Sequence, residues 1–189
     1  MSSADLDLVA LRHRLHALAE LSGAEAATAA AVADLLRACA PADLLTGLGG
    51  HGVAAVFAAP AGAPGPTVVL RAELDALPIP ETLDLDHASL TAGCAHKCGH
   101  DGHTAILLGV ARELAATPPA GGRVVLLFQP AEETGQGAAR VAADPRFLDL
   151  SPDWLFALHN LPGYPAGKVL VRAGAFCAGS AGLTVHNTN

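Results

Sequence analysis

The chain has 189 residues, of which 51% are hydrophobic and 15% charged, and this balance excludes an intrinsically disordered protein. Its net charge is −7 and its 11 Lys and Arg residues form no basic stripe, so nucleic acid is not an expected partner. The sequence has no secretory signal and no apolar run of about 20 residues, which predicts a soluble cytoplasmic chain without a membrane partner.

The N-terminal part of the chain predicts two helices. Leucines recur at helical spacing over residues 5–20, which predicts an amphipathic helix there. A second helix is expected over residues 24–40, where Pro41 would end it. His13 and His16 lie on the first helix. We interpret them as exposed or capping histidines rather than metal ligands, because no other ligand type is close by in the sequence.

Short apolar runs bounded by glycine and proline follow, and they predict strands. These runs are residues 44–45, 53–59 and 67–70. The last run continues into Glu73 and Asp75, which lie two positions apart and so share a face if the chain is extended. Such a strand end is a place to hold an imidazole or a metal ion, although spacing alone equally fits a solvated strand end.

Residues 96–103 contain three imidazoles, a thiol and a carboxylate. These side chains, once deprotonated, bind borderline transition metals. Gly99 would let the chain bend so that Cys98 and His100 converge on one point. Because an apolar helix is expected over residues 102–116, we interpret the segment as a ligand-bearing loop that leads into a buried helix.

The four cysteines are too few and too unevenly spaced for a disulfide framework. Cys39 and Cys177 lie among apolar or small residues and are expected to fill space in the core. Cys98, followed by His100, is the one cysteine with a metal-like neighbourhood.

Two later strands are also expected to deliver polar side chains at their ends. Residues 123–128 are a near-continuous apolar run that leads to Glu132 and Glu133, and residues 153–158 lead to His159. Binding sites in open sheets form beyond the carboxyl ends of strands, so we expect these side chains at one site. One glutamate could then ligate a metal ion while its neighbour moves a proton.

The remainder of the chain predicts a short helix over residues 137–143 and strands over residues 168–172 and 183–186. The last strand stops almost at residue 189 without a following element. We therefore expect a chain that is cut rather than finished.

Four segments resemble, in order, the signature segments of the N-acyl-amino-acid amidohydrolases, which include hippurate hydrolases and indoleacetyl-amino-acid hydrolases. The segments are residues 71–78, 98–103, 130–133 and 158–162. These enzymes are a branch of the aminoacylase- and carboxypeptidase-like dinuclear metallopeptidases. The resemblance implies an α/β fold in which helices flank a mixed, largely parallel sheet, as in zinc-exopeptidase-like catalytic domains.

The resemblance also assigns roles by motif position. It implies four metal ligands: Cys98, His100, Glu133 and His159. It implies that Glu132 is the catalytic base and that Asp75 holds a ligand or the bridging water in place. Two divalent ions are implied, zinc or manganese, with cobalt or nickel also suited to mixed ligands. The implied reaction is hydrolysis of the amide bond of N-acyl amino acids or related small amides by a metal-activated water.

Family members are longer than this chain. They carry an inserted lid and dimerisation domain, through which they form homodimers, and then a second catalytic segment with one more metal-binding histidine. We therefore expect residues 1–189 to be the N-terminal portion of a catalytic domain that stops at the start of the lid domain, and to be weakly active or inactive alone.

Two other interpretations stay open. In the first, Cys98 is a nucleophile and His100 or His103 is its base, which leaves the glutamate pair and His159 without a role. In the second, the chain is a non-catalytic metal- or partner-binding remnant of such an enzyme.

Overall fold

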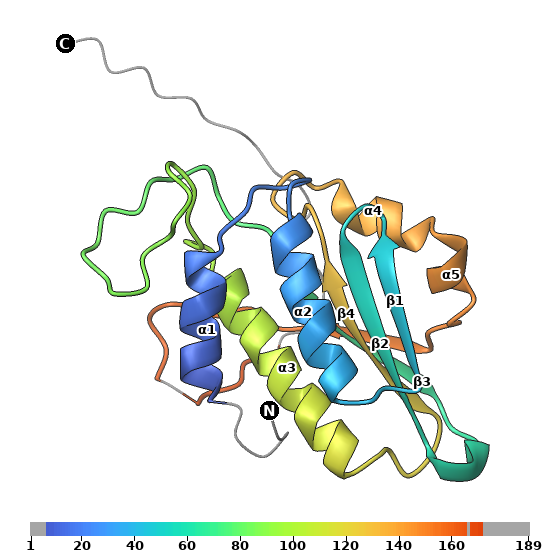
Figure 1. Ribbon diagram of the computed structural model, residues 1–189. Coiled ribbons are helices and arrows are strands. Elements are labelled where there is room, and N and C mark those ends of the chain that lie inside the picture. Colours follow the sequence, from blue (N-terminus) through green and yellow to red (C-terminus); the bar gives the residue numbers. More distant parts are fainter. Residues whose placement is uncertain (1–6, 166, 172–189) are drawn as a thin grey trace, which may run out of the picture.

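The computed structural model describes residues 7–165 and 167–171 and is built around a five-stranded sheet with the order β1-β2-β4-β3-β5 (Figure 1). The strands are β1 (Asp43–Leu48), β2 (Gly52–Ala58), β3 (Thr67–Glu73), β4 (Arg123–Gln129) and β5 (Trp154–Ala157). β2 pairs antiparallel with both β1 and β4, whereas β3 pairs parallel with both β4 and β5. The predicted α/β fold with a mixed sheet is confirmed.

Helices cover both faces of this sheet. The first face carries α1 (Leu8–Ala17), α2 (Ala26–Ala38) and α3 (His100–Ala116), and the second carries α4 (Gly137–Ala142) and α5 (Pro145–Leu148). A short 3-10 turn, η2 (Pro60–Gly62), precedes β3. Among the residues that the structure describes, no helix is long and apolar enough to span a membrane.

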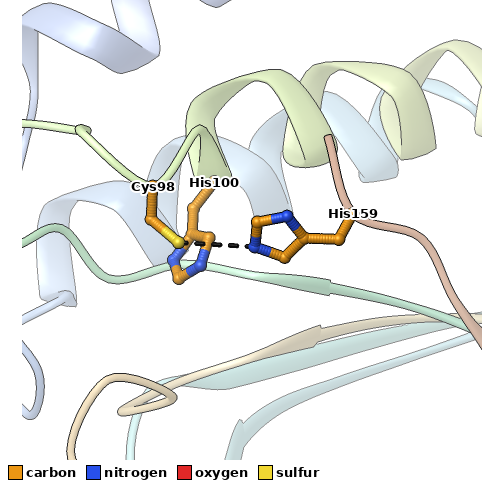
Figure 2. A group of neighbouring side chains, drawn as sticks. All are labelled: Cys98, His100 and His159. Carbon is orange, nitrogen blue, oxygen red and sulfur yellow. Dashed lines mark hydrogen bonds between the residues drawn. The ribbon is translucent and has the colours of Figure 1, made fainter. Parts of the chain in front are cut away.

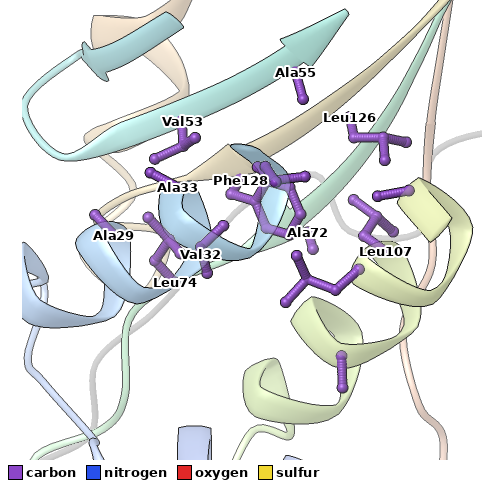
Figure 3. Packing of buried hydrophobic residues seen from close by; sticks show 14 of the residues in the cluster. Ala29, Val32, Ala33, Val53, Ala55, Ala72, Leu74, Leu107, Leu126 and Phe128 are labelled. Carbon is purple, nitrogen blue, oxygen red and sulfur yellow. The ribbon is translucent and has the colours of Figure 1, made fainter. Parts of the chain in front are cut away.

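The larger hydrophobic core lies between the sheet and α1, α2 and α3 (Figure 3). Val32 of α2, Leu107 of α3 and Phe128 of β4 are almost fully buried in it. Successive strand residues point to opposite faces, so Val53 packs in this core while Ala54 packs in the second cluster, under α4 and α5. Burial on both faces explains why β2, and β4 between its polar end residues, are apolar.

The predicted helices and strands before residue 158 are present, with shifted ends, and α5 was not predicted. The one shift that matters for the site is at α3, which begins at His100 rather than at residue 102. Gly99 precedes it with a φ of 91°, a left-handed conformation that suits glycine. His100 therefore lies on the first turn of a helix, not in a loop as predicted, and His103 follows it on the same helix.

The strand predicted over residues 168–172 is wrong for its described part. Residues 168–171 are irregular, and Val169 and Val171 are 84% and 93% exposed. Within residues 7–165 and 167–171, no strand lies beside this segment to pair with it. An unpaired strand has no ladder of hydrogen bonds to stabilise it, whatever its alternation of apolar and polar residues. The strand predicted over residues 183–186, and Cys177, lie outside the described residues.

The topology gathers the chemically active side chains at one edge. Because β3, β4 and β5 are mutually parallel, their carboxyl ends lie at the same edge of the sheet. Asp75 follows β3, Glu132 and Glu133 follow β4, and His159 follows β5. The first turn of α3 carries His100 to the same place.

Candidate metal centre

A thiol and two imidazoles converge where α3 begins (Figure 2). Cys98 Sγ lies 3.4 Å from His159 Nε2. One potential ligand atom from each of Cys98, His100 and His159 falls within 4.8 Å of the other two. The segment before α3 and the loop after β5, 61 positions apart in the chain, thus supply one group of candidate ligands.

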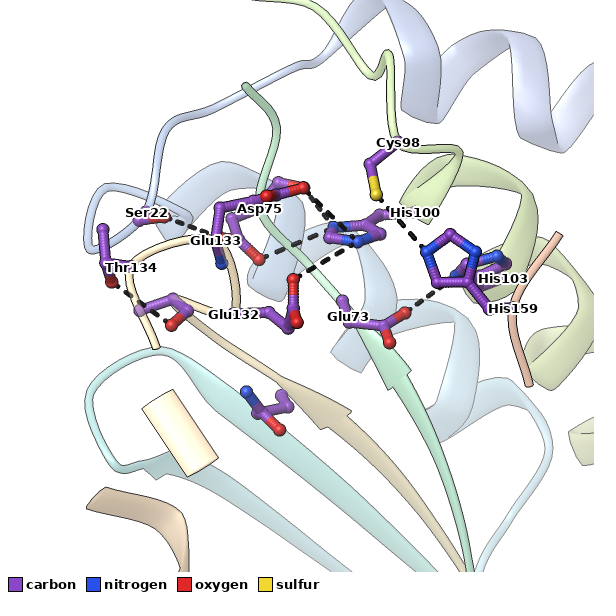
Figure 4. A network of polar contacts seen from close by, with 12 residues as sticks. Ser22, Glu73, Asp75, Cys98, His100, His103, Glu132, Glu133, Thr134 and His159 are labelled. Carbon is purple, nitrogen blue, oxygen red and sulfur yellow. Dashed lines mark hydrogen bonds and ion pairs between the residues drawn. The ribbon is translucent and has the colours of Figure 1, made fainter. Parts of the chain in front are cut away.

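The glutamate pair reaches the same group from β4 (Figure 4). His100 Nε2 lies 3.7 Å from Glu132 Oε2 and 3.7 Å from Glu133 Oε1. These three side chains form a second group whose ligand atoms are within 4.8 Å of one another. The structure therefore brings the four predicted metal ligands together, with the predicted base beside them.

The two imidazoles present the same nitrogen to this centre. His100 Nδ1 donates to the main-chain oxygen of Asp75 at 2.8 Å, and His159 Nδ1 donates to the main-chain oxygen of Asn160 at 2.7 Å. A carbonyl oxygen can only accept, so each Nδ1 carries a proton. In the neutral rings the lone pair is then on Nε2, the nitrogen that a metal ion would bind.

Unpartnered buried atoms show that a cation fits here. His100 Nε2 and Glu133 Oε1 are buried and have no hydrogen-bond partner in the structure. Leaving a buried polar group unpaired is costly, and such groups are rare in folded proteins. Thiolate, imidazole and carboxylate ligands suit zinc and the neighbouring divalent transition metals. The residues present fit a metal ion, and the structure alone does not select one.

Asp75 lies beside the centre and contacts both Glu133 and His100. Its Oδ2 accepts from Ser22 Oγ at 2.6 Å and from the main-chain N–H of Glu133 at 3.0 Å, and its Oδ1 lies 3.7 Å from His100 Nδ1. Burial raises the pKa of Asp75, but the nearby His100 ring and hydrogen bonds from Ser22 and Glu133 lower it by more, to well below its usual range. Asp75 is therefore ionised, and its hydrogen bond from the main chain of Glu133 holds that residue in place.

Glu132 and Cys98 have raised pKa values. Burial, and next the charge of Glu133, raise the pKa of Glu132, whose side chain is still 38% exposed and accessible to a small molecule. Burial and the carboxylates of Glu133 and Glu132 raise the pKa of Cys98 to about 12. Nucleophilic cysteines need the opposite shift, so this environment argues against Cys98 as a nucleophile.

The turn that carries the glutamates is held by Glu25, which the sequence analysis did not single out. Glu25 Oε1 accepts from the main-chain N–H of Ala131 at 2.7 Å, across 106 positions of chain. Gly137 N–H closes the same turn onto Ala131 O, and a Cβ at Gly137 would lie 1.6 Å from Pro130 O. No local pattern marks Glu25 or Ser22, because both act through contacts far along the chain.

Glu73 and His103 form a buried pair beside the centre. His103 Nδ1 donates to Glu73 Oε2 at 2.8 Å, and Arg71 pairs with the other Glu73 oxygen. Burial raises the pKa of Glu73, but His103 and then Arg71 lower it overall. Glu73, His100 and His103 form a third group whose ligand atoms fall within 4.8 Å. The predicted ability of this strand end to hold an imidazole is confirmed.

The predicted environment of His16 is wrong. His16 is buried rather than exposed, and it caps no helix: its Nδ1 lies 2.9 Å from Asp101 Oδ2 and its Nε2 2.9 Å from Glu81 Oε2. The two carboxylates compensate the burial of the ring. In the described part of the chain, neither His16 nor His13 belongs to a group of candidate metal ligands, and His13 stacks on His87.

Comparison with known proteins identifies the family to which this chain belongs. Residues 69–187, more than half of the chain, match the model of peptidase family M20/M25/M40, and all four segments of the predicted resemblance lie within that match. The chain belongs to this family. The predicted resemblance to amidohydrolases of the dinuclear metallopeptidase type is thereby confirmed.

Relatives of this M20 chain include a deacetylase and an amino acid hydrolase. N-acetyl-L-cysteine deacetylase of Bacillus subtilis (strain 168) is 39% identical over 184 residues, which is 94% of this chain and 42% of the relative. IAA-amino acid hydrolase ILR1-like 6 of Arabidopsis thaliana is 44% identical over 115 residues, 60% of this chain and 24% of that protein.

A solved structure gives the same fold. The Bacillus subtilis YxeP protein, described as a dinuclear metal binding peptidase from the M20 family, superimposes with a TM-score of 0.75 at 35% sequence identity. The match covers 85% of this chain and 44% of YxeP. The M20 chain thus spans less than half the length of these relatives.

Proposed function

We propose that this chain is the N-terminal portion of the catalytic domain of a metal-dependent amidohydrolase that cleaves the amide bond of N-acyl amino acids or related small amides. One observation carries the proposal: three potential ligand side chains, from two strand ends and the start of a helix, surround the unpartnered Nε2 of His100, with Glu132 beside it. The names of two relatives, N-acetyl-L-cysteine deacetylase and IAA-amino acid hydrolase, support the substrate class.

Two divalent ions, zinc or manganese, would be held by four residues, and cobalt or nickel would suit the same mixed ligands. These residues are Cys98, His100, Glu133 and His159. Bound there, the ions would make a water molecule acidic and polarise the amide carbonyl.

Glu132 performs the proton transfers in this proposal. Its carboxylate accepts a proton from the attacking water, whose oxygen adds to the carbonyl carbon. The same carboxyl group then gives the proton to the amide nitrogen as the C–N bond breaks, which releases a carboxylic acid and an amino acid. Burial and the charge of Glu133 raise the pKa of Glu132, and a raised pKa makes its carboxylate a stronger base for taking the proton from water. Asp75 keeps Glu133 and His100 in place through this cycle.

The relatives are more than twice as long as the matched region, and their additional length is expected to supply the lid, the homodimer contacts and a further metal-binding histidine. The 189 residues assayed alone are therefore expected to turn over slowly. A rate near 10 per second, about the median for enzymes, would contradict this expectation. A cytoplasmic location stays a prediction.

The test combines metal analysis with an amidase assay on the chain loaded with zinc or manganese. Glu132→Gln should retain the metal and lose about 10²- to 10⁴-fold in hydrolysis of an N-acetyl amino acid or hippurate. Glu113→Gln, an exposed change on α3, is the matched control and should alter neither. Bound metal without turnover above the Glu132→Gln level would favour a non-catalytic remnant, and absence of metal binding would refute the proposal.

A further inference from the structure

His159 is the candidate ligand that packing restrains least. Residues 158–165 are exposed throughout, and β5, which precedes them, is a four-residue edge strand paired with β3. His100, by contrast, is the first residue of a long, largely buried helix, and Cys98 precedes it by two positions. A loop with this exposure samples many conformations unless specific contacts hold it, so the position of His159 needs a separate cause.

Asn160 supplies those contacts. His103 Nε2 lies 3.1 Å from the main-chain nitrogen of Asn160 and 2.7 Å from its Oδ1. Nε2 can accept from the N–H or donate to Oδ1, so this one nitrogen contacts both the main chain and the side chain of Asn160. The Asn160 amide also fills the space beside Gly99, where a Cβ would come within 2.6 Å of Oδ1.

His103 is itself fixed from the sheet. Its Nδ1 donates to Glu73 at the end of β3, and Arg71 on the same strand pairs with Glu73. The neighbouring Thr104 hydroxyl donates to the main-chain oxygen of Glu73 at 2.9 Å. A rigid connection therefore runs from β3 through His103 to the exposed loop.

The main-chain oxygen of Asn160 accepts from His159 Nδ1, and this turns His159 Nε2 toward Cys98. We infer that Asn160 is a positioning residue that sets the orientation and tautomer of His159. His103 holds Asn160 in place, and the absence of a Cβ at Gly99 leaves room for its amide. The inference rests on the proposed function only in that His159 is taken as a ligand.

The test uses Asn160→Ala, which removes the amide from an exposed loop, with Tyr164→Ala in the same loop as the matched control. Zn²⁺ affinity, measured by competition with a chelator, should fall about 10- to 100-fold in Asn160→Ala, as for other groups that orient ligands. Tyr164→Ala should bind as the parent does. The metal-free melting temperature of Asn160→Ala should match the parent, which separates positioning from folding.

A second readout needs no metal. Long-range proton–nitrogen NMR of the metal-free protein at alkaline pH should show His159 with its proton on Nδ1 in the parent and a mixture of tautomers in Asn160→Ala. Equal Zn²⁺ affinity in parent and Asn160→Ala, an equal loss in Tyr164→Ala, or an unchanged tautomer would each overturn the inference. If the parent binds no Zn²⁺, the proposed function fails, and the tautomer measurement alone decides the inference.

Discussion

Replacing Glu25 by alanine tests how the turn that carries Glu132 and Glu133 is held. Glu25 is 0% exposed, and its Oε1 accepts from the main-chain N–H groups of Gly23 at 2.9 Å and of Ala131 at 2.7 Å. The alanine variant leaves both N–H groups without this acceptor, and the one on Ala131 is buried. We therefore expect a loss of stability that does not depend on metal or substrate.

The magnitude follows from the two lost acceptors. A buried donor left unpaired costs about 1–3 kcal/mol, and the N–H of Gly23 is only partly buried, so the pair is expected to cost about 3 kcal/mol. In a domain of this size, 1 kcal/mol lowers the melting temperature by about 2–4 °C. The Glu25→Ala variant should therefore melt about 6–12 °C below the parent.

The assay is thermal and urea unfolding in the presence of a chelator, so that no bound ion contributes. Glu25→Gln keeps an oxygen acceptor and should melt closer to the parent than Glu25→Ala does. Asp34→Ala removes an acidic group that is 76% exposed on α2, the helix that begins after Glu25, and it should cost less than about 1 kcal/mol. A Glu25→Ala variant that melts within about 2 °C of the parent would refute the assigned role.

Three further measurements address the core, an ion pair and the metal. Phe128→Ala should lower the free energy of unfolding in urea by about 3–5 kcal/mol, because Phe128 is completely buried, and a loss below about 1 kcal/mol would contradict the packing. Hydrogen bonds from Lys97 and His16 lower the pKa of Glu81 from 4.5 to about 2, so its stabilisation is full above pH 4.5 and is lost as the pH falls through about 2. The difference in melting temperature between Glu81→Gln and the parent should therefore shrink from about pH 6 to about pH 2, and a constant difference would contradict this. Zn²⁺ at a hundred times its dissociation constant should stabilise the chain by about 2.7 kcal/mol and a chelator should reverse the shift, whereas no shift with zinc, manganese, cobalt or nickel would count against the metal centre.

The sequence was informative where one strand end or one short segment carries the chemistry. An apolar strand that ends in a polar residue marked Glu132, Glu133 and His159, and the parallel arrangement of β3, β4 and β5 then explains why these ends meet. Cys98 and His100 were found because they lie two positions apart across a glycine. These features are local, so the residue pattern reveals them without knowledge of the fold.

Contacts between distant parts of the chain could not be found in this way. Ser22 bonds to Asp75 across 53 positions, and His16 is buried against Asp101 across 85. Helical periodicity describes one face of α1 but does not say which acids will pack against it. Asn160, adjacent to His159, is the one missed residue that sequence proximity could have suggested.

The proton positions on His100 and His159 depend on peptide oxygens, which belong to every amino acid, rather than on side chains. A substitution at Asp75 can delete a carboxylate while its peptide oxygen still accepts from His100. Mutagenesis can therefore change the charge beside the centre and leave the proton positions on the histidines unchanged. Where a carboxylate orients a histidine, the two properties change together. At His100 the same feature tolerates sequence drift, since replacing Asp75 leaves the accepting peptide oxygen intact, whereas at His159 the oxygen keeps its position only while the Asn160 side chain holds the loop.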